Sequence, residues 1–116
     1  MLEINGVALE FDILDADTAE RYESATEAVV KQLGELDLDK MSQAEAIRQE
    51  CYIVFDYFDA IFGEGTAKTI FGEKTNIGIC AAAMEQVSNS AAEQNKAFSD
   101  RLTKYRPNRA SRRAKA

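Results

Sequence analysis

Apolar residues recur at spacings of three and four along three long stretches of this chain, the pattern of helices with one buried face. The first helix is predicted to begin at Asp15 or Asp17, because Asp17-Thr18-Ala19-Glu20 offers an N-cap with a glutamate three residues later. We expect Gly34 to end this helix and residues 36–40 to connect it to the next one. Its apolar stripe consists of Tyr22, Ala25, Val29, Val30 and Leu33.

The second helix is predicted to be the centre of the core. Ser42-Gln43-Ala44-Glu45 is a capping box, in which side chains satisfy the free backbone donors of the first turn. Gly63 is expected to stop the helix. Its buried face is the most apolar in the chain and consists of Ile47, Cys51, Val54, Phe55, Phe58, Ile61 and Phe62, widened by Tyr52, Ile53 and Tyr57.

The third helix follows a cap at Thr75 or Asn76 and carries a seam of about three heptads. Many of its residues are alanines, which would let another helix approach closely. Pro107 is expected to mark the end of ordered structure. The seam positions are Ile77, Cys80, Met84, Val87, Ala91, Gln94 and Phe98.

A short repeat separates the second and third helices. Ile61-Phe62-Gly63-Glu64 recurs nine residues later as Ile70-Phe71-Gly72-Glu73. Glycine adopts the left-handed conformation that commonly follows a last helical turn, so the repeat predicts two helix stops in succession. Thr66 is expected to cap one short helix between them. The result would be a rigid corner with apolar sides.

The first residues alternate apolar and polar side chains around Asn5-Gly6, a strong signal for a two-residue β-turn. Leu2 and Ile4 share one face of the first arm, and Val7, Leu9 and Phe11 share one face of the second. A lone hairpin is marginal in water, so this one must dock on the helices or on a neighbouring chain. The predicted fold class is therefore mostly α: a small helical bundle of three main helices plus one short helix, with an N-terminal β-hairpin and a disordered basic C-terminal tail.

Charge divides the chain sharply. Residues 1–100 hold all 20 acids and seven bases, whereas residues 101–116 hold seven bases and no acid. We expect one domain over residues 1–104 and a flexible basic tail over residues 105–116. The tail residues that would contact a nucleic acid or an acidic protein surface are Arg106, Arg109, Arg112 and Arg113. Nucleic acid is the weaker of these two interpretations, because the acidic body would repel its backbone and Tyr105 alone is available for stacking. The third interpretation is that the tail binds nothing and only keeps the protein soluble.

The residue types argue against catalysis. The chain has no histidine, which removes histidine-dependent nucleophilic pairs and most transition-metal sites. Its acids are spread as on a solvated helix face. The segment Gly63-Glu64-Gly65-Thr66-Ala67-Lys68-Thr69 lacks the glycine before Lys-Thr that a phosphate-binding loop requires, and it follows a helix. We therefore expect no enzymatic activity, no cofactor and no metal.

The two cysteines lie singly within apolar stripes and are predicted to be reduced core residues. No apolar run is long enough for a membrane span, and the first residues do not resemble a signal peptide. These features predict a protein that remains in the cytoplasm of the cell that makes it. A domain of this size has little surplus core, so oligomerisation would help it.

Three segments of the chain together resemble the tail assembly chaperones of long-tailed phages and prophages of Gram-positive bacteria. They are residues 1–12, beginning Met1-Leu2-Glu3-Ile4-Asn5-Gly6; residues 62–76, beginning Phe62-Gly63-Glu64-Gly65-Thr66-Ala67-Lys68-Thr69; and residues 107–113, Pro107-Asn108-Arg109-Ala110-Ser111-Arg112-Arg113. The resemblance implies a protein that binds the long helical tape measure protein. It would keep this client soluble until tail tube subunits assemble around it, and leave before the virion is complete.

A helix-binding role gives the predicted surfaces a purpose. The alanine-rich third helix would form a groove for a client helix, and the apolar corner would close the end of that groove. The alternative is that both features are internal packing. Two other functions stay open: a nucleic-acid-binding phage regulator that uses the basic tail, and a structural tail or connector subunit that self-associates through the third helix. The candidate partner-binding residues are Phe62, Ile70, Phe71, Ile77, Met84 and Ala91.

Overall fold

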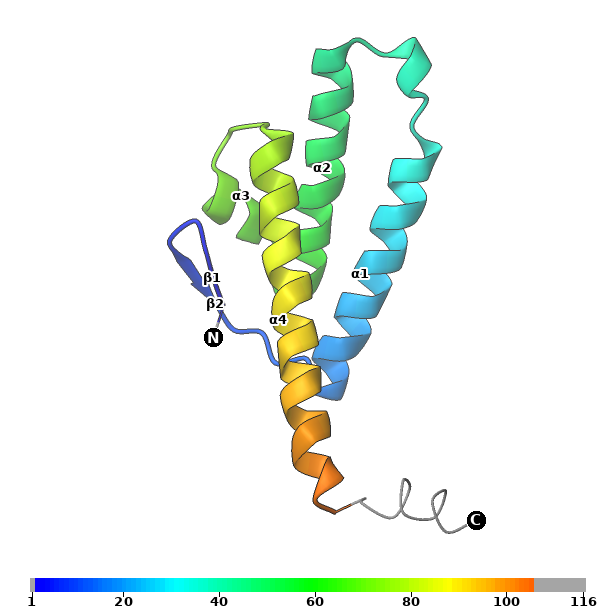
Figure 1. The fold of residues 1–116 in the computed structure, drawn as a ribbon. Helices are drawn as coiled ribbons and strands as arrows, with labels where there is room; N and C mark the ends of the chain where they lie inside the picture. The colour runs from blue at the N-terminus through cyan, green and yellow to red at the C-terminus, as the bar shows by residue number, and fades with distance from the viewer. Residues whose placement is uncertain (1, 106–116) are drawn as a thin grey trace, which may run out of the picture.

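The structure is a computed structural model that describes residues 2–105 of the chain. Within these residues it is mostly α-helical with a two-stranded N-terminal hairpin, which confirms the predicted fold class (Figure 1). The predicted tail, apart from Tyr105, lies outside the described residues. In chain order the elements are β1 (Leu2–Ile4), β2 (Val7–Leu9), α1 (Ala16–Glu35), the 3-10 helix η1 (Leu38–Lys40), α2 (Gln43–Phe62), α3 (Thr66–Phe71) and α4 (Ile77–Thr103).

The hairpin turns where the sequence predicts. Asn5 and Gly6 have φ of 51° and 80°, and the antiparallel register pairs Ile4 with Val7. The Ile4 side chain is fully buried. β1 packs against α4, where Gln86 Nε2 donates a hydrogen bond to the carbonyl oxygen of Glu3 at 3.3 Å. The hairpin thus gains from α4 the stability that it lacks alone.

Side-chain caps begin the three long helices; those of α2 and α4 are at predicted residues, whereas α1 is capped by Asp15, and Asp17 of the predicted cap motif lies inside its first turn. Asp15 accepts a hydrogen bond from the Thr18 backbone, Ser42 from Glu45 and Asn76 from Ile79, each at 3.1 Å. These bonds satisfy backbone donors that a first turn leaves free.

The predicted end of the first helix is wrong by one residue. Gly34 lies inside α1, which continues to Glu35 and ends with Leu36 as its C-cap. Gly34 does not take a positive φ, so it does not serve as the left-handed stop that the sequence suggests.

The double stop between α2 and α4 is confirmed. Gly63 and Gly72 have φ of 115° and 64°, and their backbone N–H groups donate to the carbonyls of Asp59 and Lys68. The predicted cap at Thr66 is wrong, because Gly65 is the N-cap of α3. The missing side-chain cap is supplied from α2: Asp59 Oδ1 accepts from the Ala67 backbone at 2.9 Å. This bond fixes α3 to the end of α2.

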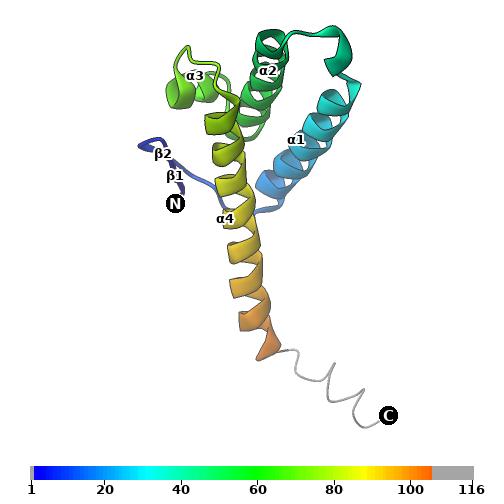
Figure 2. The ribbon, with the colours of Figure 1, turned by 45° about the horizontal axis from the view of Figure 1, so that its top comes forward.

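α2 is the central element of the core and packs against α1, α3 and α4. Cys51, Val54, Tyr57, Phe58 and Ile61 form its buried face. α1 and α4 each pack on α2 but diverge from one another, which both views show (Figures 1 and 2).

The described part of the chain is elongated. Its extents are 61 × 32 × 21 Å, and the radius of gyration is 18.0 Å, whereas a compact domain of this length would have about 13 Å. The C-terminal turns of α4 project past the rest of the bundle (Figure 1). Within residues 2–105 no helix is both long and apolar enough to cross a membrane.

Candidate functional site

The aromatic corner formed by Phe62, Ile70 and Phe71 is packed into the fold. The Phe71 ring centroid lies 5.3 Å from those of both Phe55 and Phe58, and Phe62 stacks on Phe58 at 5.9 Å. Only 6% of Ile70 and 8% of Phe71 is exposed, and Phe62 is half-buried. Most of the surface of these three candidate partner-binding residues is therefore used for internal packing.

A small depression nevertheless reaches the edge of this corner. Its volume is about 140 Å³, and Ile70 and Phe71 line it together with Ile79 of α4. Ile79 is 40% exposed, and Asn5 Nδ2 closes one side by donating to the Ile70 carbonyl at 3.4 Å. Ile70 and Phe71 thus contribute to the surface only through their edges.

The seam of α4 faces the core over most of its length. Cys80, Val87 and Ala91 are buried, while Ile77 and Met84 are half-buried. Of the candidate partner-binding residues on this helix, Ala91 belongs to the core, and Ile77 and Met84 retain exposed surface.

Gln94 occupies a position of the α4 seam, but its side chain makes hydrogen bonds there, which the apolar periodicity did not indicate. Its Oε1 accepts from the Ile13 backbone at 3.0 Å, and its Nε2 donates to the Phe11 carbonyl at 2.9 Å. Nε2 also donates to Ser90 Oγ at 3.0 Å. One amide side chain therefore ties the segment between the hairpin and α1 to α4.

α1 and α4 are joined at one point and separate beyond it. Tyr22 Oη donates to Ser88 Oγ at 3.5 Å. One to three turns further along α1, Thr26 and Leu33 lie on the same face as Tyr22, with Val30 beside them. Val30 is 66% exposed and Leu33 is 37% exposed. The prediction that both lie in a buried stripe is wrong, because α4 diverges from α1 before it reaches them (Figures 1 and 2).

The corresponding turns of α4 carry small or flexible apolar residues. Ala81 and Met84 lie on the side of α4 that bears Ser88, and they are exposed and half-buried respectively. We call this region the α1–α4 opening and define it by Val30 and Leu33 of α1 and Ala81 and Met84 of α4.

α2 lies behind the point where α1 and α4 are joined. Tyr57 of α2 is 3% exposed, and burial raises the pKa of its hydroxyl, with Tyr22 close by adding to the rise. The Thr26 hydroxyl lies beside it and donates to the Tyr22 carbonyl at 2.8 Å. Neutral hydroxyl groups thus surround this junction, and they offer no general acid or base near neutral pH.

A second concave surface lies on the other side of α1, between α1 and α2. Its volume is about 420 Å³, with Ala25, Ala28 and Ala60 among its apolar lining and Asp17 and Glu20 among its acids. We call it the α1–α2 groove.

Arg21 also lines the α1–α2 groove, but its guanidinium is held by the protein itself. Arg21 Nε donates to the Ile61 carbonyl and Nη2 to Thr18 Oγ1, each at 3.2 Å. Arg21 also lines a neighbouring depression of about 460 Å³ that contains Glu10, Asp12 and Asp15. Acids therefore outnumber bases along this side of the molecule.

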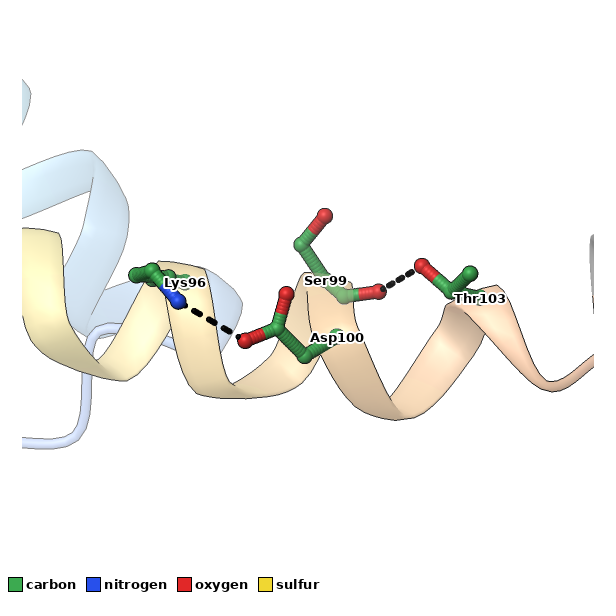
Figure 3. Close-up of polar contacts among 4 residues, drawn as sticks. All are labelled: Lys96, Ser99, Asp100 and Thr103. Carbon is green, nitrogen blue, oxygen red and sulfur yellow. Dashed lines mark hydrogen bonds and ion pairs between the residues drawn. The ribbon is translucent and has the colours of Figure 1, made fainter. Parts of the chain in front are cut away.

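The last turns of α4 are stabilised by local contacts. Lys96 pairs with Asp100 at 3.0 Å, and the Thr103 hydroxyl donates to the Ser99 carbonyl at 2.9 Å (Figure 3). The ion pair is well exposed and stabilises the helix by only about 0.3–0.5 kcal/mol. The predicted basic contacts that follow lie outside the described residues: Arg106, Arg109, Arg112 and Arg113.

The two cysteines form a buried thiol pair between α2 and α4. Both are fully buried and free. Burial raises the pKa of Cys80 to about 12, and the hydrogen bond from its thiol to Cys51 adds to this rise. Burial also raises the pKa of Cys51. Within residues 2–105, no group of three or more cysteine and acidic side chains is placed to hold a metal ion.

The comparison with known protein families gives one match. A family described as a family of unknown function, DUF6673, matches residues 5–116. No curated protein and no solved structure shows significant similarity to the chain.

Proposed function

The chain belongs to DUF6673, a family of unknown function, and we propose that it acts as a tail assembly chaperone that binds an amphipathic helix of a tape measure protein. The sequence resemblance supplies the identity of the client. The α1–α4 opening is the single structural observation that carries the binding role.

An amphipathic helix needs an apolar surface that is accessible in the unbound protein. Val30 exposes 66% of its surface and Leu33 exposes 37%, although both continue the side of α1 that packs at Tyr22. Met84 on the α4 side has an unbranched, polarisable side chain that adapts to partners of different shape. A client helix laid across the diverging ends of α1 and α4 would cover these exposed apolar side chains with its own apolar face.

The same geometry revises the candidate binding residues. Met84 keeps its proposed role, and Ile77 lies on the same helix with part of its surface exposed. Ile70, Phe71 and Ala91 are buried and Phe62 is half-buried, so they are not among the proposed contacts. Val30 and Leu33 join the proposed contacts.

Charge supports the chaperone role through solubility. Residues 1–100 hold 20 acids and seven bases, and this excess of negative charge favours the solubility of a complex in which several copies cover one client. In this proposal the protein acts in the cytoplasm of the bacterial host. It releases the client as tail tube protein assembles and is absent from the mature virion.

Co-expression with the tape measure protein of the same phage tests the proposal. The wild-type chain is expected to raise the soluble yield of the tape measure protein. A Val30→Ser, Leu33→Ser variant is expected to lose that effect, because it removes both exposed apolar contacts on α1. A Lys31→Ser, Gln32→Ser variant changes the two exposed residues between them and is expected to behave as wild type.

Two results would contradict the proposal. One is an unchanged soluble yield with the wild-type chain. The other is an equal rise with the Val30 and Leu33 variant, which would move the binding site elsewhere. Recovery of the chain from purified virions would instead favour a structural tail subunit.

A further inference from the structure

We propose that the end of α4 from one copy of this protein docks into the α1–α2 groove of a second copy. The α4 end is defined by the apolar side chains Phe98, Leu102 and Tyr105 and by the basic side chains Arg101 and Lys104. The contact is distinct from the client site proposed above, because the groove and the α1–α4 opening lie on different sides of α1.

The α4 end presents an apolar helix face that the rest of the chain leaves partly uncovered. Phe98 and Tyr105 are 38% and 78% exposed, and Leu102 is half-buried. Phe98 and Leu102 are four residues apart and lie on one side of α4, and Tyr105 follows in the turn after Thr103, with its backbone N–H bonded to the Leu102 carbonyl. This side continues the seam that is buried at Val87 and Ala91, but here the helix extends past the bundle (Figures 1 and 2). Exposed apolar side chains in continuation of a buried seam offer a surface on which an apolar partner can pack.

The α1–α2 groove has the shape and chemistry to receive such a face. Ala25, Ala28 and Ala60 contribute only methyl groups, which lets an incoming helix approach closely, and the groove volume is about 420 Å³. Asp17 and Glu20 supply negative charge beside those methyl groups. Arg21 also lines the groove and offsets one of these charges, so the groove keeps a formal charge of −1; its guanidinium is held in place by bonds to the neutral Ile61 carbonyl and Thr18 hydroxyl.

Charge complementarity identifies a second copy as the occupant. Residues 10–27, which contain the α1 side of the groove, hold seven acids and one base. Residues 101–105, which complete the described α4 end, hold two bases, Arg101 and Lys104, and no acid. Opposite charge on two surfaces guides encounter and fixes their relative orientation.

The two surfaces do not meet within one copy. α4 is a continuous helix from Ile77 to Thr103, so its end cannot turn back toward the body of the bundle. Its last turns project beyond the start of α1 (Figure 1). Each copy thus has one surface that inserts, the α4 end, which we call the donor, and one that receives it, the α1–α2 groove, which we call the acceptor. This arrangement produces a reciprocal dimer, a ring or an open chain.

Sedimentation velocity on the full-length chain tests the contact. The wild type is expected to associate, and more strongly at about 20 mM salt than at about 500 mM, because salt screens exposed charges. A donor variant, Phe98→Ser with Leu102→Ser, and an acceptor variant, Ala28→Lys, are each expected to raise the dissociation constant at least about tenfold. Ala97→Ser and Ala44→Lys are exposed controls that should associate like the wild type. Circular dichroism should show unchanged helix content in all of them.

A mixing experiment decides the result. The donor variant retains an intact groove and the acceptor variant retains an intact α4 end. An equimolar mixture of the two is expected to form one-to-one heterodimers even where each alone is monomeric. A monomeric wild type, an oligomer that neither variant weakens, or a mixture that stays monomeric would each overturn the proposal. None of these results depends on the client, which is tested through Val30 and Leu33.

Discussion

Gln94 gives the sharpest test of how the two ends of the described chain are held together. Gln94→Met keeps a side chain of similar size but removes the amide that accepts from Ile13 and donates to Phe11. Each partly buried hydrogen bond contributes about 1 kcal/mol, and a backbone group left without a partner adds a desolvation penalty. The expected loss of unfolding free energy is therefore about 2 kcal/mol. For a domain of this length that loss lowers Tm by about 10 °C.

Gln86→Met is the matched control. It makes the same substitution on the same helix, but Gln86 contributes one exposed hydrogen bond, to the Glu3 carbonyl at 3.3 Å. Its expected cost is below about 0.5 kcal/mol. Urea denaturation followed by circular dichroism measures both variants.

Hydrogen exchange locates the effect. The Ile13 amide is expected to exchange faster in Gln94→Met and at the wild-type rate in Gln86→Met. If both variants lose the same stability, or if Ile13 exchange is unchanged in Gln94→Met, then Gln94 does not hold the N-terminal segment to α4. The reasoning about its seam position would then be refuted.

Three further comparisons test the core, the helix ends and the thiol pair. Phe58→Ala removes a fully buried ring and is expected to lower the unfolding free energy by about 3–5 kcal/mol. Phe98→Ala, on the exposed end of α4, should lower it by less than about 1 kcal/mol in urea denaturation. Equal losses in the two variants would contradict the projecting helix end. Gly72→Ala should destabilise the protein by about 1 kcal/mol, because Gly72 has a φ of 64°. Gly34→Ala should stabilise it by about 0.5–1 kcal/mol, because Gly34 lies inside α1 with open space around it. Shifts of Tm with the same sign in the two variants would refute this difference. The pKa of Cys80 is about 12 in the fold and its ordinary value is 9.0, so the thiol of the unfolded chain ionises first as the pH rises. The unfolding free energy should therefore fall above about pH 9, by up to about 1.4 kcal/mol per pH unit. A Cys80→Ala variant whose stability declines equally steeply would contradict this.

Local signals in the sequence predict the elements well. The Asn5-Gly6 turn, the caps at Ser42 and Asn76 and the stops at Gly63 and Gly72 each depend on a few neighbouring residues. Such features are set by backbone conformation and by hydrogen bonds within one turn. They are therefore readable without knowledge of the tertiary fold.

Relations between elements are harder to predict. Periodicity shows that Leu33 and Phe98 lie on apolar faces, but it does not show that the neighbouring helix diverges before Leu33 or that the bundle ends before Phe98. It also places Ala91 and Phe98 on the same seam, although one is core and the other is surface. Periodicity likewise does not show that the candidate residues Ile70, Phe71 and Ala91 are buried.

Two polar residues show the same limit. Asp59 caps α3 from a different helix, and Gln94 holds a backbone segment more than 80 positions earlier in the chain. A single polar residue in an apolar stripe signals that it has a partner, but the sequence does not say which one.

The closing of the N-terminal hairpin onto α4 has a consequence for synthesis. Glu3 and Phe11 are bonded by Gln86 and Gln94, in both cases across 83 positions of the chain. On the ribosome, α1 and α2 emerge early enough to pair with each other, whereas the first strand must wait for almost the last helix to leave the exit tunnel. The hairpin is therefore translated before the helices but docks only after α4 has been made as far as residue 86, and a nascent chain stalled before that residue would carry it undocked.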